Sequence, residues 1–244
     1  MRLQFLGSGD AFGSGGRFNT CILVESATGA FLIDCGASSL IAMRKYGIDP
    51  NRVDTVFISH LHGDHFGGLP FLILDAQFYS RRTRPLTLVG PRGFRDRLMQ
   101  VMELLFPGSS GVERRFTTEI REIDVGATAV INGVKVTAYL VEHACGAPPF
   151  ALRLACDGKV LAYTGDTEWT ENLLAVGRGA DLLIAEALFF ERRVKYHLDY
   201  ASLKGNLGRI GAKRVILTHL GPEMLSHLGD VPEETAEDGM IVEI

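Results

Sequence analysis

Three histidines and an aspartate lie within the short segment Ser59-His60-Leu61-His62-Gly63-Asp64-His65. Imidazole nitrogens and carboxylate oxygens bind divalent metal ions, and burying so many polar groups is costly unless something compensates them. His60 and His62 are two residues apart, so in an extended stretch their side chains project to the same side and can meet one ion. Asp64 and His65 follow Gly63, whose flexible backbone allows a bend toward a second ion. The spacing therefore predicts a centre of two metal ions.

Three further candidate ligands each stand where an apolar strand ends. His143 follows the strand at Val134–Val141, Asp166 follows Val160–Tyr163, and His219 follows Val215-Ile216-Leu217-Thr218. Strand ends are where sheet proteins tend to assemble sites. A single histidine at such a place is more often structural than a ligand. Because the same chain contains the HxHxDH loop, a role as metal ligands becomes the favoured interpretation for these residues.

The elements that must position these residues alternate between apolar strands and helix-like segments. We predict strands at Arg2–Leu6, Thr20–Ser26, Ala30–Asp34, Thr55–Ser59, Thr87–Val89, Arg121–Ile123, Thr128–Ile131, Val134–Val141, Phe150–Ala155, Val160–Tyr163, Leu182–Ala185, Arg214–Leu217 and Met240–Val242. We predict helices at Ser38–Tyr46, Phe66–Tyr79 (buried on most sides), Pro91 to about Phe106, Glu171–Val176 and Ala201–Ile210. Asn132–Gly133 has the composition of a hairpin turn. This alternation predicts sheets covered by helices, and two such halves could face each other in one αββα sandwich.

Composition excludes several classes of protein. The 244 residues are 46% hydrophobic and 22% charged, which is globular, and the formal net charge of −4 argues against a general nucleic-acid binder. No apolar run reaches the ~20 residues that a membrane helix needs. The start MRLQFLGSGD has no features of a signal peptide, and the four cysteines show no CxxC pairing. We therefore expect a cytoplasmic protein without a membrane segment.

With these motifs in view, the sequence resembles the metallo-β-lactamase superfamily of hydrolases. The resemblance runs from the glycine loop Gly7–Gly16 through Leu32-Ile33-Asp34-Cys35-Gly36, the HLHGDH segment, His143, Thr164-Gly165-Asp166-Thr167 and Thr218-His219. It implies an α/β fold in which two mixed sheets form a four-layer αββα sandwich, as a single domain over residues 1–244. A homodimer is also consistent with it.

The resemblance also assigns the ligands. It implies that His60, His62 and His143 hold one metal ion, that Asp64, His65 and His219 hold the other, and that Asp166 bridges the two. Asp34 corresponds to a buried aspartate that supports the metal loop from behind. Nitrogen and oxygen ligands without a thiolate suit zinc, with manganese or iron as alternatives. Two such ions share a water molecule and lower its pKa. Asp64, as a ligand of this centre, is therefore also predicted to be a catalytic residue.

Within the superfamily the chain is most similar to the ribonuclease Z branch and the phosphodiesterases near it. HLHGDHFGGLP resembles the metal loop of that branch, and Glu186 with His197 resembles its glutamate–histidine pair. The resemblance implies that His197 is the general acid for the leaving oxygen and that Glu186 orients it. Ala185 and Leu198-Asp199 depart from the pattern of the branch around this pair.

The chain differs from ribonuclease Z where that enzyme carries a long basic arm for tRNA. Only 23 positions (166 minus 143) separate His143 from Asp166, enough for a turn and two strands. We therefore predict a dinuclear phosphodiesterase that acts on a small anionic phosphodiester and binds no large nucleic acid. Hydrolysis of a lactone or thioester at the same centre is the alternative. A tRNA 3′-processing endonuclease and a non-catalytic metal-binding module remain as further alternatives.

Overall fold

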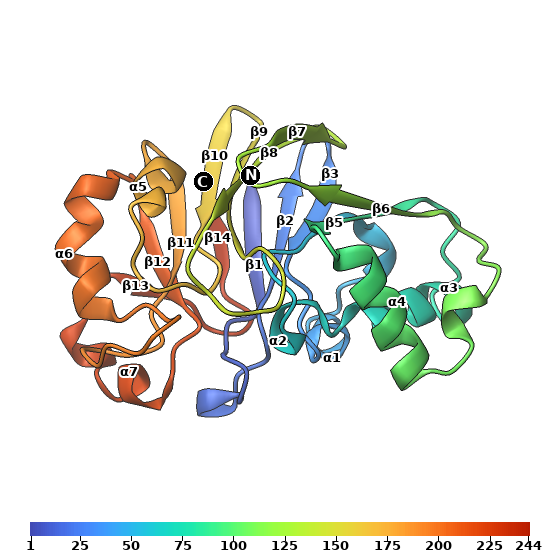
Figure 1. Cartoon of the computed structure of the whole chain (residues 1–244), viewed down its shortest axis with the longest axis horizontal. Coiled ribbons are helices and arrows are strands. Elements are labelled where there is room, and N and C mark those ends of the chain that lie inside the picture. Colours follow the sequence, from blue (N-terminus) through green and yellow to red (C-terminus); the bar gives the residue numbers. More distant parts are fainter.

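Two β-sheets lie face to face with helices on both outer sides in the computed structural model, which describes residues 1–244 (Figure 1). Each sheet has seven strands, in the orders β14-β1-β2-β3-β4-β5-β6 and β13-β12-β11-β10-β9-β8-β7. Helices α1, α3 and α4 lie on one outer side, while α5, α6 and α7 lie on the other (Figure 1). The predicted four-layer αββα sandwich of two mixed sheets is confirmed.

The bounds of the elements agree with most of the predicted ranges to within three residues. The first sheet consists of β1 (Arg2–Gly7), β2 (Cys21–Ser26), β3 (Gly29–Ile33), β4 (Val53–Phe57), β5 (Leu86–Pro91), β6 (Thr118–Ile123) and β14 (Ile241–Glu243). The second consists of β7 (Thr128–Ile131), β8 (Val134–Leu140), β9 (Phe150–Cys156), β10 (Lys159–Tyr163), β11 (Leu182–Glu186), β12 (Val215–Thr218) and β13 (Glu234–Thr235). The α-helices are α1 (Ser39–Lys45), α2 (Gly63–Phe66), α3 (Leu69–Phe78), α4 (Phe94–Leu105), α5 (Asn172–Gly177), α6 (Tyr200–Ile210) and α7 (Pro222–Ser226). Four short 3-10 turns are η1 (Ser14–Gly16), η2 (Pro50–Arg52), η3 (Ser109–Gly111) and η4 (Leu228–Asp230).

Strand direction decides where a site can form. From β3 to β6 the neighbours run parallel, and so do β10 to β13. The strands β8, β9 and β10 are joined by antiparallel pairing, so β8 and β10 point the same way. The ends of β8, β10, β11 and β12 therefore meet at one edge of the second sheet.

Alternation along the strands builds three apolar layers. On β1, Leu3 and Phe5 point into the layer between the two sheets, whereas Leu6 points toward the helices of the first sheet. The same alternation on β10 places Leu161 between the sheets and Ala162 against α5 and α6. Because both faces of these strands are covered, their sequences read as continuous apolar runs.

Two helix predictions were wrong in detail. The single helix over Phe66–Tyr79 is divided into α2 and α3 by Gly67-Gly68. At Gly68 the backbone passes so close to the loop after β3 that a Cβ atom would lie 2.2 Å from the carbonyl oxygen of Gly36. Nor is the helix buried to its end, since Phe78 and Tyr79 are 65% and 76% exposed.

Pro91 does not open the helix that follows it. It is the last residue of β5, where it pairs with Ile123, and α4 begins only at Phe94 after Gly93 in a left-handed conformation. A strand end tolerates proline because the missing N–H is not needed there. The Asn132–Gly133 turn is confirmed, with both residues at positive φ between antiparallel β7 and β8. No helix is both long and apolar enough to cross a membrane.

Candidate metal centre

The histidine loop begins where β4 ends and closes into the short helix α2. His62 stands at the N-terminal end of α2 in an extended conformation, and Asp64 lies in its first turn. The amide of His65 donates to the carbonyl of His62 across 3.0 Å, which fixes the bend. The loop thus presents His60 and His62 before the bend, with Asp64 and His65 after it.

The second sheet brings its three candidate ligands to the same place from separate strand ends. His143 follows β8, Asp166 follows β10 and His219 follows β12. His219 has a φ of 59°, an uncommon value for a side-chain-bearing residue, and its amide donates to the carbonyl of Ser8 across 3.0 Å. Strained backbone of this kind is typical of functional sites.

The seven predicted ligands form two adjoining groups. One group contains His60, His62 and His143, and the other contains Asp64, His65, Asp166 and His219; within each, one donor atom per residue lies within 4.8 Å of all the others. In the first group, Nε2 of His143 is 2.9 Å from Nδ1 of His62. In the second, Asp166 Oδ1 is 3.2 Å from Nε2 of His65, and Oδ2 is 3.3 Å from Nε2 of His219.

Asp166 lies between the two groups. Its Oδ2 is also 3.9 Å from Nε2 of His60, which belongs to the first group. The side chain is 3% exposed. A carboxylate at this position can offer an oxygen to each of two neighbouring cations.

Unpartnered buried atoms test whether cations fit this site. Nε2 of His60, Nε2 of His65 and Oδ1 of Asp166 are buried and have no hydrogen-bond partner. Leaving such groups unpaired costs several kcal/mol unless a ligand satisfies them, roughly 1–3 kcal/mol for each. All three atoms belong to residues of the two donor groups, so divalent cations bound there would satisfy the atoms that the protein leaves without a partner.

In four of the five histidines, a protein group contacts the ring nitrogen Nδ1. Nδ1 of His65 contacts Asp34 Oδ2 at 2.7 Å, and Nδ1 of His60 contacts Ser59 Oγ at 3.0 Å. The carbonyl of Tyr196 accepts from Nδ1 of His143 across 2.8 Å. For His219 the partner is the hydroxyl of Thr20, 3.3 Å from Nδ1. Such partners fix the ring orientation and leave Nε2 as the metal-binding atom.

The electrostatics of the site favour positive charge in the second group. Burial lowers the pKa of His65, but the carboxylates of Asp166 and Asp64 outweigh it and raise this pKa well above its ordinary value. Burial alone raises the pKa of Asp166, yet the neighbouring His219 and His65 hold it well below its ordinary value. In the first group, burial lowers the pKa of both His60 and His143. Neutral imidazoles in one group and carboxylates in the other are both suited to divalent cations.

Glu186 and His197 form a hydrogen-bonded pair directly beside the second group, and with Asp166 and His219 they make a third cluster in which one donor atom per residue lies within 4.8 Å of all the others. Nδ1 of His197 donates to Oε1 of Glu186 across 2.5 Å, and the other carboxylate oxygen accepts from the amide of Thr167 at 2.8 Å. Both oxygens of Glu186 are therefore engaged, and its side chain is 1% exposed against 24% for His197. Burial lowers the pKa of His197, but the hydrogen bond and charge of Glu186 outweigh it, so the pKa ends above its ordinary value. The ring of His197 lies 5.0 Å from that of His143, centre to centre.

Sequence reasoning missed the residues that act through their backbone or from distant turns. Tyr196 has a φ of 74°, its carbonyl holds His143, and its amide donates to Glu168 across 2.9 Å. Asp238 accepts from the amide and the hydroxyl of Ser8, each at 2.9 Å, and so fixes the glycine loop beside His219. No motif marks either residue. The position of Tyr196 directly before His197 was the only available signal.

Comparison with known proteins agrees with this geometry. Ribonuclease Z of Bacillus velezensis is 26% identical over 288 aligned residues, covering 97% of this chain and 92% of that protein. The crystal structure of the short form of human tRNase Z is similar with a TM-score of 0.80 at 25% identity, covering 100% of this chain and 99% of that one. A diphosphatase of the PhnP family has the same fold, with a TM-score of 0.80 at 19% identity and coverage of 100% and 97%.

The fold and the two donor groups define a metal-dependent hydrolase of the metallo-β-lactamase superfamily, similar to ribonuclease Z. A family model described as anti-Pycsar protein Apyc1 matches residues 1–241. The chain belongs to that family.

Proposed function

We propose that this protein hydrolyses a small phosphodiester at a centre of two divalent ions, zinc in the first place and manganese or iron as alternatives. His60, His62 and His143 would hold one ion, and Asp64, His65 and His219 the other, with Asp166 between them. When bound, two such ions would activate a water molecule and stabilise the negative charge on the oxygens around phosphorus. The two cations outweigh the two carboxylates, so the site favours an anionic substrate.

The observation that carries the choice of a phosphodiester is the Glu186–His197 pair. An alkoxide leaving group needs a proton, and a histidine beside the donor groups, held by a buried carboxylate, supplies one. In this proposal the oxygen of a water molecule, which loses a proton to the solvent, bonds to phosphorus while the P–O bond to the leaving alcohol breaks. The electron pair of the broken bond stays on the leaving oxygen, which takes the proton of His197 Nε2. Glu186 then keeps the ring oriented and stabilises its charge through Nδ1. Opening a thioester requires such an acid less, because a thiolate is a weakly basic leaving group.

The substrate is proposed to be small because the chain between His143 and Asp166 is filled by β9 and β10. These two strands pair through residues such as Leu152 and Tyr163 and leave no arm to grip a folded RNA. The relatives named above include tRNA-processing enzymes, so binding of a tRNA substrate is the outcome that would contradict this part. The four cysteines are free and buried, as suits the cytoplasm that we propose as the location.

Hydrolysis of bis(p-nitrophenyl) phosphate by protein loaded with zinc or manganese tests the proposal. We expect turnover that Asp64→Ala and Asp166→Ala reduce by at least about a hundredfold, because each removes a ligand from the centre. A lactone and a thioester, assayed with the same loaded protein, test the alternative. Activity on either of these, with phosphodiester hydrolysis no faster than in Asp64→Ala, would overturn the proposal.

A further inference from the structure

Four residues form a closed series of contacts around His143. The amide of Glu168 donates to the carbonyl of Glu142, the residue before His143, across 3.1 Å. The side chain of Glu168 accepts from the amide of Tyr196 across 2.9 Å, and the carbonyl of Tyr196 accepts from Nδ1 of His143 across 2.8 Å. The loops after β8 and β10 and the segment between β11 and α6 are therefore joined at one ligand of the first donor group.

Tyr196 is the third residue of a four-residue turn. The amide of His197 donates to the carbonyl of Val194 across 3.3 Å and closes this turn. The third residue of such a turn has a φ of about −90° or about +80°, according to the orientation of the central peptide. Tyr196 has a φ of 74°, a conformation that glycine adopts readily and tyrosine does not. Tyrosine would therefore favour the opposite orientation of the peptide unless another group holds it.

The central peptide of the turn carries the amide that Glu168 binds. This peptide joins Lys195 to Tyr196, and its N–H is the donor of the 2.9 Å hydrogen bond. Turning the peptide over would move the N–H away from the carboxylate. Because a hydrogen bond to a charged acceptor is stronger than one between neutral groups, the bond to Glu168 can offset the cost of the left-handed conformation.

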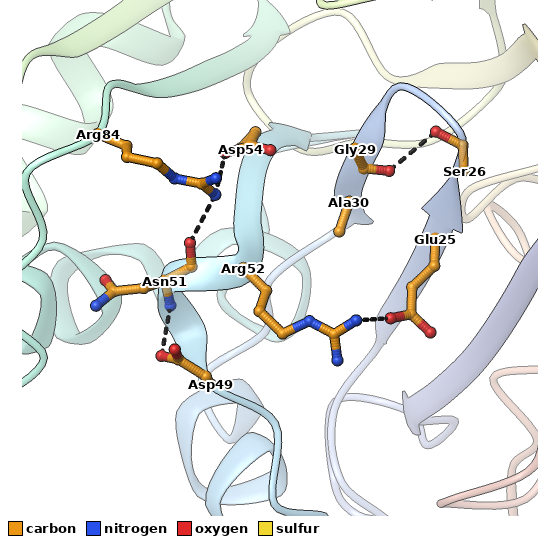
Figure 2. A pocket seen from close by; sticks show the side chains of 9 residues that line it. All are labelled: Glu25, Ser26, Gly29, Ala30, Asp49, Asn51, Arg52, Asp54 and Arg84. Carbon is orange, nitrogen blue, oxygen red and sulfur yellow. Dashed lines mark hydrogen bonds and ion pairs between the residues drawn. The ribbon is translucent and has the colours of Figure 1, made fainter.

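Carboxylates at the other end of the sandwich show more usual arrangements (Figure 2). Near the start of β4, away from the histidine loop, Asp54 pairs with Arg84 at 2.6 Å. Asp49 accepts from the amide of Asn51, only two residues later, at 2.9 Å and so caps η2 (Figure 2). Glu168 forms no ion pair, and it accepts from an amide 28 positions along the chain, in a different loop. Its hydrogen bond therefore fixes one loop of the site relative to another.

The turn also positions His197, which directly follows Tyr196. The Nδ1 atom of His197 donates to Glu186, and its ring centre lies 5.0 Å from that of His143. A rotation of the peptide before Tyr196 would displace the carbonyl that supports His143 and the backbone to which His197 is attached. The same hydrogen bond therefore affects two groups of the site.

We propose that Glu168 is a positioning residue, which holds the turn at Tyr196 in the conformation that supports His143 and places His197. In this role its carboxylate acts through the backbone of Tyr196, by accepting a hydrogen bond. The part of the inference that concerns His197 rests on the proposed function. The part that concerns His143 requires only that the first donor group holds an ion.

Competition with a coloured chelator measures how tightly the protein holds each of two zinc ions. We expect Glu168→Ala to weaken the binding of one ion by about tenfold, the lower end of what is usual when a supporting partner of a ligand is changed. Because the effect passes through His143, adding Glu168→Ala to His143→Ala should weaken binding no further. A second loss of about tenfold in the His143→Ala background would contradict the inference.

Tyr196→Gly gives a sharper test, because glycine keeps the carbonyl and adopts a positive φ without strain. This variant should bind zinc within about threefold of the parent, and adding Glu168→Ala to it should cost no more than about threefold. A loss of about tenfold between these two proteins overturns the inference. The comparison also decides the matter if Glu168→Ala by itself does not fold.

Two conservative changes separate the hydrogen bond from the charge. Glu168→Gln keeps an acceptor oxygen and should bind zinc within about threefold of the parent. Glu142→Gln removes the charge of an exposed carboxylate next to His143 whose side chain forms no hydrogen bond, and it should also leave zinc binding unchanged. If either variant loses as much affinity as Glu168→Ala, negative charge near the ions is responsible instead of the turn, and the inference is wrong.

A kinetic comparison tests the placement of His197. Glu168→Ala should lower kcat for a phosphodiester with a nucleoside leaving group about tenfold more than for bis(p-nitrophenyl) phosphate, because only the nucleoside oxygen needs a proton. Adding Tyr196→Gly should remove this difference. An equal loss for the two substrates contradicts the role of Glu168 toward His197. If the parent hydrolyses neither substrate, the proposed function fails instead, and the zinc affinities still decide the role of Glu168 toward His143.

Discussion

Asp34 and His65 are joined by a hydrogen bond of 2.7 Å between two side chains with no solvent exposure. The same carboxylate accepts from the amide and the hydroxyl of Ser59, at 2.7 and 2.8 Å, and from the hydroxyl of Tyr163 at 3.0 Å. Asp34 follows β3 in the first sheet, whereas Tyr163 ends β10 in the second. One buried carboxylate therefore supports the histidine loop and connects the two sheets.

Replacing Asp34 should be among the most destabilising single changes in this chain. We expect Asp34→Ala to lower the free energy of unfolding by roughly 4 kcal/mol, because it leaves four buried donors without an acceptor. Urea unfolding measured by circular dichroism gives the value. Tyr163→Phe is the control, since it removes one donor and should cost about 1 kcal/mol. Equal effects of the two variants on the free energy of unfolding would show that the four hydrogen bonds to Asp34 do not all contribute to stability.

Asp34→Asn removes the negative charge of the side chain but keeps its shape. Asp34 has a φ of 57°, a conformation that asparagine tolerates better than alanine does. We expect this variant to fold but to bind metal more weakly than the parent by about 10–100-fold, as is usual when a supporting partner of a ligand is changed. Competition with a coloured chelator measures the affinity, and an unchanged affinity would count against the supporting role of the carboxylate.

Two divalent ions per chain are expected after refilling with zinc. Chelation should lower the melting temperature by at least about 5 °C, because a bound ion present at a hundred times its Kd stabilises the folded state by about 2.7 kcal/mol. Elemental analysis and differential scanning calorimetry measure the two quantities. Asp166→Ala should hold fewer than two ions, whereas Glu186→Gln should keep both, since Glu186 already uses both oxygens within the protein. Loss of metal from Glu186→Gln would make it a ligand instead of a positioning residue.

The role of His197 as an acid is tested by changing the leaving group. A p-nitrophenolate leaves without a proton, so His197→Ala should reduce its release by no more than about tenfold. An alkoxide such as a nucleoside 3′-oxygen needs the proton, and here we expect a loss of about 10²–10⁴-fold in kcat. Glu186→Gln should also reduce the reaction of the alkoxide substrate more than that of the p-nitrophenyl ester, but by a smaller factor, because Glu186 only orients the ring of His197. A uniform loss for both kinds of substrate would indicate a structural role.

Two buried thiols should make the protein less stable in alkali. Burial raises the pKa of Cys21 from 9.0 to about 12 and raises that of Cys35 well above its ordinary value. The unfolded chain loses these protons from about pH 9 while the folded chain keeps them, so stability is present below pH 9 and falls as the pH rises toward 12. For Cys21 the loss at pH 10.5 is roughly 2 kcal/mol. Urea unfolding at pH 8.0 and 10.5 should show a smaller decline in Cys21→Ala than in the parent, and an equal decline would contradict the assignment.

Much of this site was predictable because its signals are local. His60, His62, Asp64 and His65 occur in one motif, and their spacing alone indicates two ions. The strand ends at His143, Asp166 and His219 are visible in the apolar runs that precede them. The αββα arrangement itself came from the resemblance, because alternating strands and helices do not say how two sheets face each other.

The remaining features depend on contacts between distant segments. The division of the helix at Gly67-Gly68 depends on a loop that ends more than thirty residues earlier, at Gly36. Tyr196 supports His143 through its carbonyl, a group that every residue has and that no sequence pattern reveals. The same holds for Asp238, which fixes Ser8 from the other end of the chain.

The candidate ligands of the metal centre are divided between the two halves of the chain. His60, His62, Asp64 and His65 follow a strand of the first sheet, and the other three follow strands of the second. During synthesis the histidine loop leaves the ribosome long before His219 does, so an early ion would find an incomplete set of ligands. We therefore expect metal insertion to be a late event in the maturation of this protein, after the sheets have docked, and shortage of the ion to leave a folded but inactive pool instead of a misfolded one.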